Sequence, residues 1–234
     1  SGMPPELLPK NATLYNYKHL LEKTETVRWF LNSFFVSAST TVLVCITSSL
    51  AGYALAKKQF TGKNIVFLLV MCSIMIPWEL SLIPLFQMMK SFGWFDSYKA
   101  LILPMVAWPV GVFLMKQFMS TIPGELIDAA KIDGCSELRT FSKVVVPLVL
   151  PGIGLVAIFT FIRTWNDYLW QLLTISTNKM KTLQVGIAGL QSEYVAEFGL
   201  VMAGAVIASV PMIVVFILFQ RFFTEGITLG AIKG

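Results

Sequence analysis

The sequence has 234 residues, of which 31 are charged: 18 Lys or Arg and 13 Asp or Glu. The charged share of 13% is about half of the roughly 25% that soluble domains carry, and 56% of the residues are hydrophobic. With a mean hydropathy of +0.71, this composition excludes a soluble globular fold. The net charge of +5 is spread between apolar segments without a basic stripe, which argues against a nucleic-acid partner and favours a role in membrane orientation.

Five apolar segments are long enough to cross a bilayer, whose hydrocarbon core needs about 20 helical residues. Backbone exposed to lipid must satisfy its own hydrogen bonds, so all five are predicted to be helices. The chain is therefore expected to be an all-α, polytopic membrane protein. Pro77 and Pro84 interrupt the second segment, which is predicted to be one long, broken span. The five spans are expected at 32–56, Asn64 to Met89, Ala100 to Met115, Val144 to Ile162, and Phe198 to Gln220.

The positions of the basic residues predict the orientation. If the connection 57–63 is cytoplasmic, nine Lys and Arg residues lie inside, against four in the outside connections and four in the N-terminal segment. This excess follows the positive-inside rule. It places the loop 121–143 and the tail 224–234 in the cytoplasm, with 32–223 as the transmembrane domain. The polar segment 1–31 is then extracytoplasmic, and such a segment usually follows an earlier span, so a helix preceding this sequence is expected.

Small residues recur at helical spacing in two of the predicted spans. They are Ser48, Gly52 and Ala56 in the first span, and Gly204 and Ala208 in the last. Without bulky side chains in between, two helix backbones can approach closely. We therefore expect these two faces to pack against other helices of the protein.

The loop between the third and fourth spans carries the signals of a short helix. Pro123 suits the first helical turn, Glu125 places negative charge near the positive end of the helix dipole, and Gly134 suits the stop. A helix of about three turns is therefore predicted over 122–134.

One face of this predicted helix is small and weakly apolar. Leu126, Ala129 and Ala130 share that face by spacing, while the charged residues point elsewhere. A membrane-surface helix favours larger apolar residues and a basic polar face. From these residues alone, docking into a groove of a partner protein and lying at the membrane interface remain alternatives.

The same loop resembles the signature of the integral-membrane permease subunits of binding-protein-dependent ABC importers. That pattern is roughly E-A-A, three residues, Gly, and a Pro about a dozen residues later. Asp128 stands where the family usually has Glu, and Cys135 where Ala is common. The positions that match are Asp128, Ala129, Ala130, Gly134 and Pro147.

Other landmarks of the family occur in family order and cover essentially the whole chain. The strings IDG and VPLVLPG, at 132–134 and 146–152, are closest to the carbohydrate branch, the maltose and glycerol-phosphate permeases. Further matches are IPWELSLIP at 76–84, DSYKALILP at 96–104, TWNDYLW at 164–170 and EGITLGAIKG at 225–234.

The resemblance implies the transmembrane domain of a type I ABC importer, which has six spans where this sequence shows five. It also implies that helix 122–134 is a coupling helix, seated in a cleft of a separate cytoplasmic ATPase subunit. The charged contacts would be Glu125, Asp128 and Asp133, the close-packing surface Ala129 and Ala130, and the turn Gly134.

The resemblance implies several partners and no cofactor in this chain. No G-x-x-x-x-G-K-[ST] sequence occurs, and Gly62-Lys63 is followed by Asn64, so ATP and Mg²⁺ are expected on an ATPase dimer and not here. The chain would be a transport subunit and not an enzyme. A sister permease and an extracytoplasmic substrate-binding protein, which would meet segment 174–197, complete the assembly in a bacterial or archaeal cell membrane.

Residues for a substrate path are harder to choose. Ionisable residues inside a span are functional candidates, so Glu79, which lies between two prolines of the broken span, is expected to line a path. Asn166 and Asp167 of the TWNDYLW string are further candidates. With Trp170, however, this string fits an interfacial belt and a helix stop better than contact with a sugar. For Arg163, snorkelling toward the outer surface is favoured.

Three alternatives follow from the same residues. The cargo is expected to be a neutral sugar or oligosaccharide, because a glycerophosphate would need buried cations and only Arg163 lies inside a span. An ion-coupled secondary transporter would need embedded carboxylates near an inverted repeat, and only Glu79 qualifies. A membrane enzyme is disfavoured, because the single His19 lies in the polar N-terminal segment and the three cysteines have no C-x-x-C spacing.

Overall fold

The computed structural model describes residues 13–193 and 198–231, with side chains described at 13–190 and 198–220. All regular elements in these ranges are helical, which confirms the predicted all-α class. The elements are α1 (Tyr15–Lys23), α2 (Thr26–Lys57), α3 (Lys63–Met75), η1 (Trp78–Ser81), α4 (Leu82–Ser91), α5 (Tyr98–Val106), α6 (Pro109–Ser120), α7 (Gly124–Ile132), α8 (Glu137–Thr140), η2 (Phe141–Val145), α9 (Val146–Leu148), α10 (Leu150–Trp165), α11 (Leu169–Thr174), η3 (Asn178–Met180), α12 (Leu183–Glu193) and α13 (Phe198–Ala231).

The five predicted spans are present, but three of them are bent. By length and composition, α2 and the Phe198–Gln220 part of α13 can each cross a bilayer alone. The other three spans are bent pairs of helices. The pair α3 and η1–α4 bends by 98°, the pair α5 and α6 by 42°, and the segment Glu137–Leu148 with α10 by 79°.

Prolines account for two of the breaks. Pro77 follows the end of α3, as the sequence predicted. The break between α5 and α6 was not predicted. It arises because Pro109 disfavours helical backbone at Trp108, whose φ of −90° and ψ of 108° are extended.

Two boundaries differ from the sequence prediction. Helix α2 begins at Thr26, six residues before the first expected span, so its first turns lie in the segment assigned to the N-terminal region. The last helix continues to Ala231, so residues 224–231 of the predicted tail are helical. Residues 1–12, 194–197 and 232–234 lie outside the described residues.

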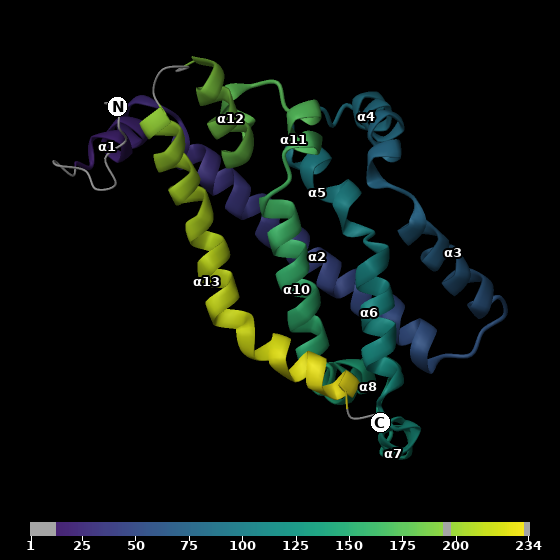
Figure 1. The fold of residues 1–234 in the computed structure, drawn as a ribbon. Coiled ribbons are helices and arrows are strands. Elements are labelled where there is room, and N and C mark those ends of the chain that lie inside the picture. Colours follow the sequence, from purple (N-terminus) through teal and green to yellow (C-terminus); the bar gives the residue numbers. More distant parts are fainter. Residues whose placement is uncertain (1–12, 194–197, 232–234) are drawn as a thin grey trace.

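Helix α2 runs the length of the bundle and packs along α6 and α10, while α13 packs on α10 (Figure 1). Helices α7 and α8 lie at one end of α2, which we call the loop end. Helices α1, α11 and α12 lie toward the opposite end, which we call the distal end (Figure 1). The structure thus separates the two groups of connections that the charge pattern assigned to opposite sides.

Helices α2 and α6 meet where α2 carries the predicted small residues. A Cβ added at Gly52 would lie 2.7 Å from the Met115 Cβ and 2.8 Å from the Lys116 backbone nitrogen. A Cβ at Gly111 of α6 would lie 2.5 Å from the Ser48 hydroxyl oxygen. These contacts confirm the predicted close packing at Ser48 and Gly52, since side chains at either glycine would force the helices apart.

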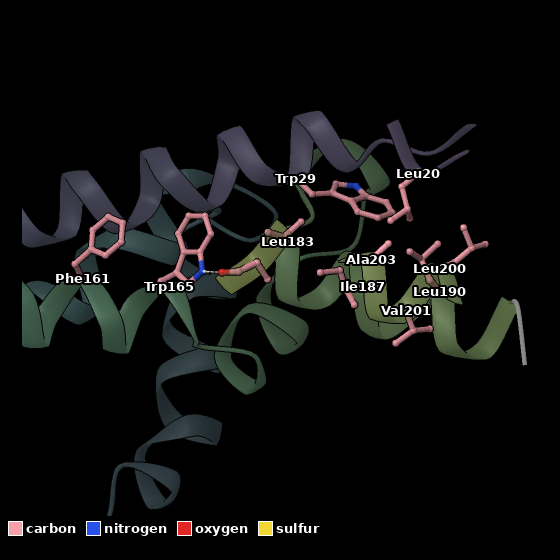
Figure 2. Packing of buried hydrophobic residues seen from close by; sticks show 11 residues of the cluster. Leu20, Trp29, Phe161, Trp165, Leu183, Ile187, Leu190, Leu200, Val201 and Ala203 are labelled. Atoms are coloured by element: carbon pink, nitrogen blue, oxygen red, sulfur yellow. Dashed lines mark hydrogen bonds between the residues drawn. The ribbon is translucent and has the colours of Figure 1, made fainter. Parts of the chain in front are cut away.

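A second contact region joins five helices near the distal end. Leu20 of α1, Trp29 of α2, Trp165 of α10, Ile187 of α12 and Leu200 of α13 belong to one buried cluster (Figure 2). Within it the Trp165 indole N–H donates a hydrogen bond of 2.9 Å to the Ala208 carbonyl oxygen of α13. This cluster holds the first half of α13 against α1, α10 and α12.

The glycine contact predicts a specific sensitivity of stability. Gly52→Val should lower the free energy of unfolding by about 1–3 kcal/mol, because the new side chain overlaps α6. The measurement is the Tm of the purified protein in detergent. Gly124→Ala is the matched control, because no atom lies within 4 Å of its added Cβ, and its Tm should not fall. An unchanged Tm for Gly52→Val would contradict the close packing.

Candidate functional site

The loop helix α7 forms as the sequence predicts and ends in a left-handed turn. Gly134 has a φ of +75°, its N–H donates to the Lys131 carbonyl oxygen at 3.0 Å, and the Cys135 N–H donates to the Ala130 carbonyl oxygen at 2.9 Å. This pair of bonds is the Schellman arrangement, which satisfies the last carbonyl groups of a helix and favours glycine. The predicted role of Gly134 as the turn is confirmed.

The buried face of α7 differs from the predicted one. Ile127 and Ala130 are only 5% and 7% exposed and pack toward the rest of the loop end. The prediction that Ala130 shares an outer face with Leu126 and Ala129 is therefore wrong. Ile127 packs into the interior, and Ala130, three residues later, lies on the same side of the helix.

The outward face of α7 is more apolar than predicted. Glu125, Leu126, Asp128 and Ala129 are exposed, and Asp128 pairs with Lys131 at 3.1 Å. Ile132 is 86% exposed, which sequence reasoning missed. With exposed Asp133 beside it, Ile132 forms an apolar surface with an acidic border.

Two lysines at the end of α2 hold this loop. The Lys57 ammonium group donates to the Ile122 carbonyl oxygen, directly before α7. The Lys58 ammonium group pairs with the carboxylate of Glu137 at the start of α8. The Tyr53 hydroxyl donates to the same carboxylate. These bonds join α2 to both sides of α7.

The same contacts set the ionisation of Glu137. The hydrogen bonds from Lys58 and Tyr53 outweigh burial and hold the pKa of Glu137 below its ordinary value. Because the pKa of Glu137 is lower in the folded state than in the unfolded state, its ionised form stabilises the fold at any pH above the unfolded-state pKa. This contribution is lost as pH falls through the folded-state pKa.

Glu137→Gln should therefore lower stability at pH 7 but not in acid. The difference at pH 7 should be about 1 kcal/mol or less, because the Glu137 side chain is 52% exposed and exposed ion pairs are weak. Tm values measured from pH 7 down to about pH 3, below the ordinary Glu pKa, test this. Glu22→Gln, which removes an exposed pair with Lys18 at 3.9 Å, is the control. A wild-type advantage that persists at low pH would contradict the assignment.

A largely apolar cavity with a few polar groups lies where three helix discontinuities meet. It has a volume of about 590 Å³ and is reached by the break between α3 and η1, the break between α5 and α6, and the end of α10. Irregular backbone at membrane depth is tolerated where it is buried in protein or lines a water-filled cavity. Its polar and aromatic lining residues include Trp78, Ser81, Trp108, Arg163, Thr164 and Asp167.

Arg163 lies in this cavity between two aromatic rings. Its guanidinium carbon is 6.0 Å from the Trp78 ring centroid and 5.5 Å from that of Trp108, within the range of cation–π attraction. One of its N–H groups donates to the Met105 sulfur at 3.1 Å. Arg163 is exposed and lies two residues before the end of α10, so its snorkelling toward the outer surface stays a prediction.

The predicted path residues do not gather in one place. Asp167 lines the cavity, and its carboxylate accepts a 3.4 Å hydrogen bond from the Trp170 backbone N–H. Glu79 is exposed in η1 and is not among the lining residues. The Asn166 amide donates to the Ile162 carbonyl oxygen at 2.9 Å and contacts Met212 of α13 at 3.4 Å, so it faces α13.

The structure corrects the interfacial belt predicted for Trp170. Its side chain is fully buried, and its indole N–H donates to the Ala100 carbonyl oxygen of α5 at 3.0 Å. Buried tryptophan normally needs such a partner for its N–H. The helix stop predicted at this motif is confirmed, since α10 ends at Trp165.

At the distal end, side chains of α2 bind the segment after α11. The Asn32 amide donates to the carbonyl oxygens of Lys179 and Lys181 at 2.9 and 2.8 Å. The Arg28 guanidinium donates to the Lys179 carbonyl oxygen at 2.9 Å. Charged residues of both signs line a cavity of about 660 Å³ here, among them Glu22, Lys23, Glu25, Arg28 and Lys181.

Asp96 fixes the beginning of the same segment. Its carboxylate accepts hydrogen bonds from the Ser176 and Thr177 backbone N–H groups at 2.9 and 3.1 Å. Burial alone would raise the pKa of Asp96, but these bonds hold the pKa below its ordinary value. Among the described residues Asp96 is the one non-glycine residue with a positive φ, 56°, a conformation that Asp tolerates better than most residues.

Metal binding finds no support in the part of the chain that the structure describes. No group of three or more His, Cys, Asp or Glu side chains there could hold a metal ion. The features with a defined geometry are therefore the anchored loop helix and the cavity around Arg163.

Comparison with known proteins decides the family. The model of the family described as binding-protein-dependent transport system inner membrane component matches residues 48–228. The chain belongs to this family. The match includes α7 and all the helix breaks around the cavity, and it confirms the resemblance seen in the loop sequence.

Several relatives match over most of their length. The arabinooligosaccharides transport system permease protein AraQ of Halalkalibacterium halodurans is 40% identical over 227 residues, which is 97% of this chain and 81% of the relative. AraQ of Bacillus subtilis is 36% identical over 100% of this chain and 83% of the relative. The trehalose transport system permease protein SugB of Mycobacterium tuberculosis is 35% identical over 98% and 85%.

A solved structure shares the fold. It is a bacterial ABC transporter involved in the import of the acidic polysaccharide alginate, with a TM-score of 0.83 and 22% identity. The match covers 93% of this chain and 82% of the transporter chain. The chain therefore has the fold of this transporter chain. The family match and the curated relatives show that it is a permease subunit of an ABC importer.

Proposed function

We propose that this permease subunit moves a neutral oligosaccharide into the cell, driven by ATP that separate ATPase subunits hydrolyse. The observation that carries the coupling part of the proposal is α7, a short helix with a free outer face and a rigid attachment to α2. The likeness to AraQ and SugB supports the oligosaccharide class. The runner-up cargo, a glycerophosphate, would need more than one buried cation.

The outer face of α7 is suited to a protein groove. Leu126 and Ile132 supply apolar surface, Ala129 permits close approach, and Glu125, Asp128 and Asp133 form the charged border. A helix that rested on lipid headgroups would instead present basic residues on its polar face. We infer that these residues contact the ATPase dimer, where ATP and Mg²⁺ bind, and that this chain holds no cofactor.

Movement of α7 would pass directly to α2. The Lys57 bond to Ile122 and the Lys58 bond to Glu137 hold the two sides of the loop to the end of α2. Closure of the ATPase subunits would shift α7. ATP can favour one conformation of the permease only if the ATP-bound ATPase binds that conformation more tightly than the other. Since α2 spans the membrane, the same displacement reaches the distal end.

The remaining assignments follow from this placement. The loop 121–143 and the tail 224–234 would face the cytoplasm, and the segment 1–31 the extracytoplasmic side. The substrate-binding protein would dock at the distal end, near segment 174–197. A sister permease would complete the substrate path. Asp167 would line part of this path, and the roles of Glu79 and Asn166 in it stay predictions.

Ala129→Trp tests the docking face. The exposed indole should block entry of α7 into a partner groove, so ATP hydrolysis stimulated by the loaded binding protein should fall about tenfold or more in the assembled transporter. One tenfold step corresponds to about 1.4 kcal/mol, less than a severe steric clash costs. ATPase co-purification and oligosaccharide uptake into proteoliposomes are measured together.

Ala129→Ser is the matched control, because it adds a single polar atom to the same exposed position. It should keep ATPase association and uptake near wild type. If Ala129→Trp also keeps both, α7 is not the contact with the ATPase. Uptake by this permease without any ATPase subunit would contradict the ATP-driven mechanism itself.

A further inference from the structure

The loop between α6 and α10 has two parts of opposite charge. Helix α7 has an acidic border on its outer face. The second part, Glu137–Leu148, leads into α10, and we call it the connecting segment. Its one acidic residue, Glu137, is paired with Lys58. Its two basic residues, Arg139 and Lys143, are exposed and form no ion pair with the described residues, so the connecting segment presents uncompensated positive charge.

The connecting segment lies close to the plane of the membrane. It is bent by 79° from α10, and transmembrane helices tilt by only about 20° on average from the membrane normal. Helix α10 has 16 residues, a length of about 24 Å, which is less than the roughly 30 Å of the hydrocarbon core. Its start at Leu150 therefore lies near the boundary of the core, and the connecting segment lies at the level of the lipid headgroups.

One side of the connecting segment packs on the bundle, and the other side is open. Thr140 and Val145 are 1% and 0% exposed, whereas Leu138 and Leu148 are 71% and 51% exposed. Exposed leucines together with free basic residues are typical of a helix that lies on a membrane surface. By the same criterion the outer face of α7, which has an acidic border, suits a protein groove.

The charge of the connecting segment selects the kind of partner. Anionic phospholipids give the cytoplasmic leaflet a negative surface, and each nearby Lys or Arg strengthens binding to it about fivefold. A zwitterionic headgroup also carries a cationic group, which Arg139 and Lys143 would repel and which Glu137 is not free to bind. A single ATPase surface would have to complement acidic α7 and the basic connecting segment at once.

We propose that the connecting segment binds anionic phospholipids of the cytoplasmic leaflet. This proposal rests on the cytoplasmic placement of the loop in the proposed function. Arg139 and Lys143 bind the lipid phosphates, and Leu138 and Leu148 insert among the upper parts of the acyl chains. The packed side of the segment holds it to the bundle, so the contact keeps the start of α10 at a fixed depth in the leaflet.

The experiment measures which lipid touches the connecting segment. Ser142, which is exposed near both basic residues, is replaced by cysteine and labelled with bimane after the native Cys45, Cys72 and Cys135 are replaced by alanine. The assembled transporter, without sugar or nucleotide, is placed in nanodiscs of equal parts phosphatidylcholine and phosphatidylglycerol. One of the two lipids carries brominated acyl chains, which quench bimane on contact. The two quenching curves give the selectivity for phosphatidylglycerol over phosphatidylcholine.

The selectivity of the wild-type segment should be about tenfold or more, because two cations favour the anionic headgroup. Arg139→Gln and Lys143→Gln should each lower it about fivefold, and the double variant should show none. In about 1 M salt, where the Debye length is about 3 Å, the wild-type selectivity should also be lost.

Arg139→Lys and Lys143→Arg are the matched controls. They keep the charge, so the selectivity should stay within about twofold of wild type. Lys90→Gln removes an exposed cation of α4, outside the connecting segment, and should leave the selectivity unchanged.

Equal quenching by the two lipids would overturn the proposal, and so would the absence of quenching, because the label would then face water or protein. Loss of the ATPase subunits from the double variant in every lipid would overturn it as well, since the ATPase would then be the partner of this surface. The quenching needs no sugar and no ATP, so these results leave the proposed cargo and the ATP-driven mechanism intact. Absence of ATP-driven oligosaccharide uptake by the wild-type transporter would instead count against the proposed function alone.

Discussion

The contact of α2 with α6 at Gly52 and Gly111 is the constraint on which the arrangement depends. Lipid tails are as apolar as leucine, so burial of apolar side chains does not drive membrane helices together, whereas close packing and hydrogen bonds do. The missing side chains let Met115 and Ser48 approach the facing backbone directly. Because this contact fixes α2 and α6 together, it also fixes α7, which follows α6.

Helix α2 connects the two ends of the protein. At the loop end it binds the segment around α7 through Lys57 and Lys58, and at the distal end it binds the segment after α11 through Arg28 and Asn32. Most of these bonds from α2 are accepted by backbone carbonyl oxygens, and one is accepted by the Glu137 carboxylate. They therefore fix the backbone of the bound segments in place. A force on α7 therefore reaches α2 through these non-covalent bonds and then passes along one continuous helix to the opposite end.

The broken helices serve a different purpose from α2. Each break ends a hydrogen-bonded ladder within the membrane, which costs free energy unless other groups satisfy the exposed backbone. Three such ends meet around Arg163, so Ser81, Thr164 and Asp167 line one cavity with it. The combination of one continuous helix and several broken ones gives the chain a stiff element and a cavity between helix ends.

The sequence predicts features that depend on neighbours along the chain. Span lengths, the break at Pro77 and the turn at Gly134 follow from local apolar length, proline sterics and the conformational freedom of glycine. The break at Trp108 was missed because Pro109 lies inside an apolar run, where a helix start and a kink look alike.

Features that depend on distant segments could not be predicted. The surroundings of Arg163 depend on the rings of Trp78 in η1 and Trp108 in the break before α6, and the buried Trp170 depends on a carbonyl group of α5. The orientation of Ala130 depends on where Ile127 anchors α7. In each case the deciding contact is made by residues far away in the sequence.

The most direct test of the coupling account is a distance measurement within the assembled transporter. Spin labels are attached at Lys131→Cys on α7 and Ile46→Cys on the exposed face of α2, in a chain whose native cysteines are replaced. The account predicts the same distance in the nucleotide-free and ATP-trapped states, while the distance between the α7 helix and its counterpart in the sister permease changes. A within-chain distance that changes as much as the between-chain distance would show that α7 moves independently of α2.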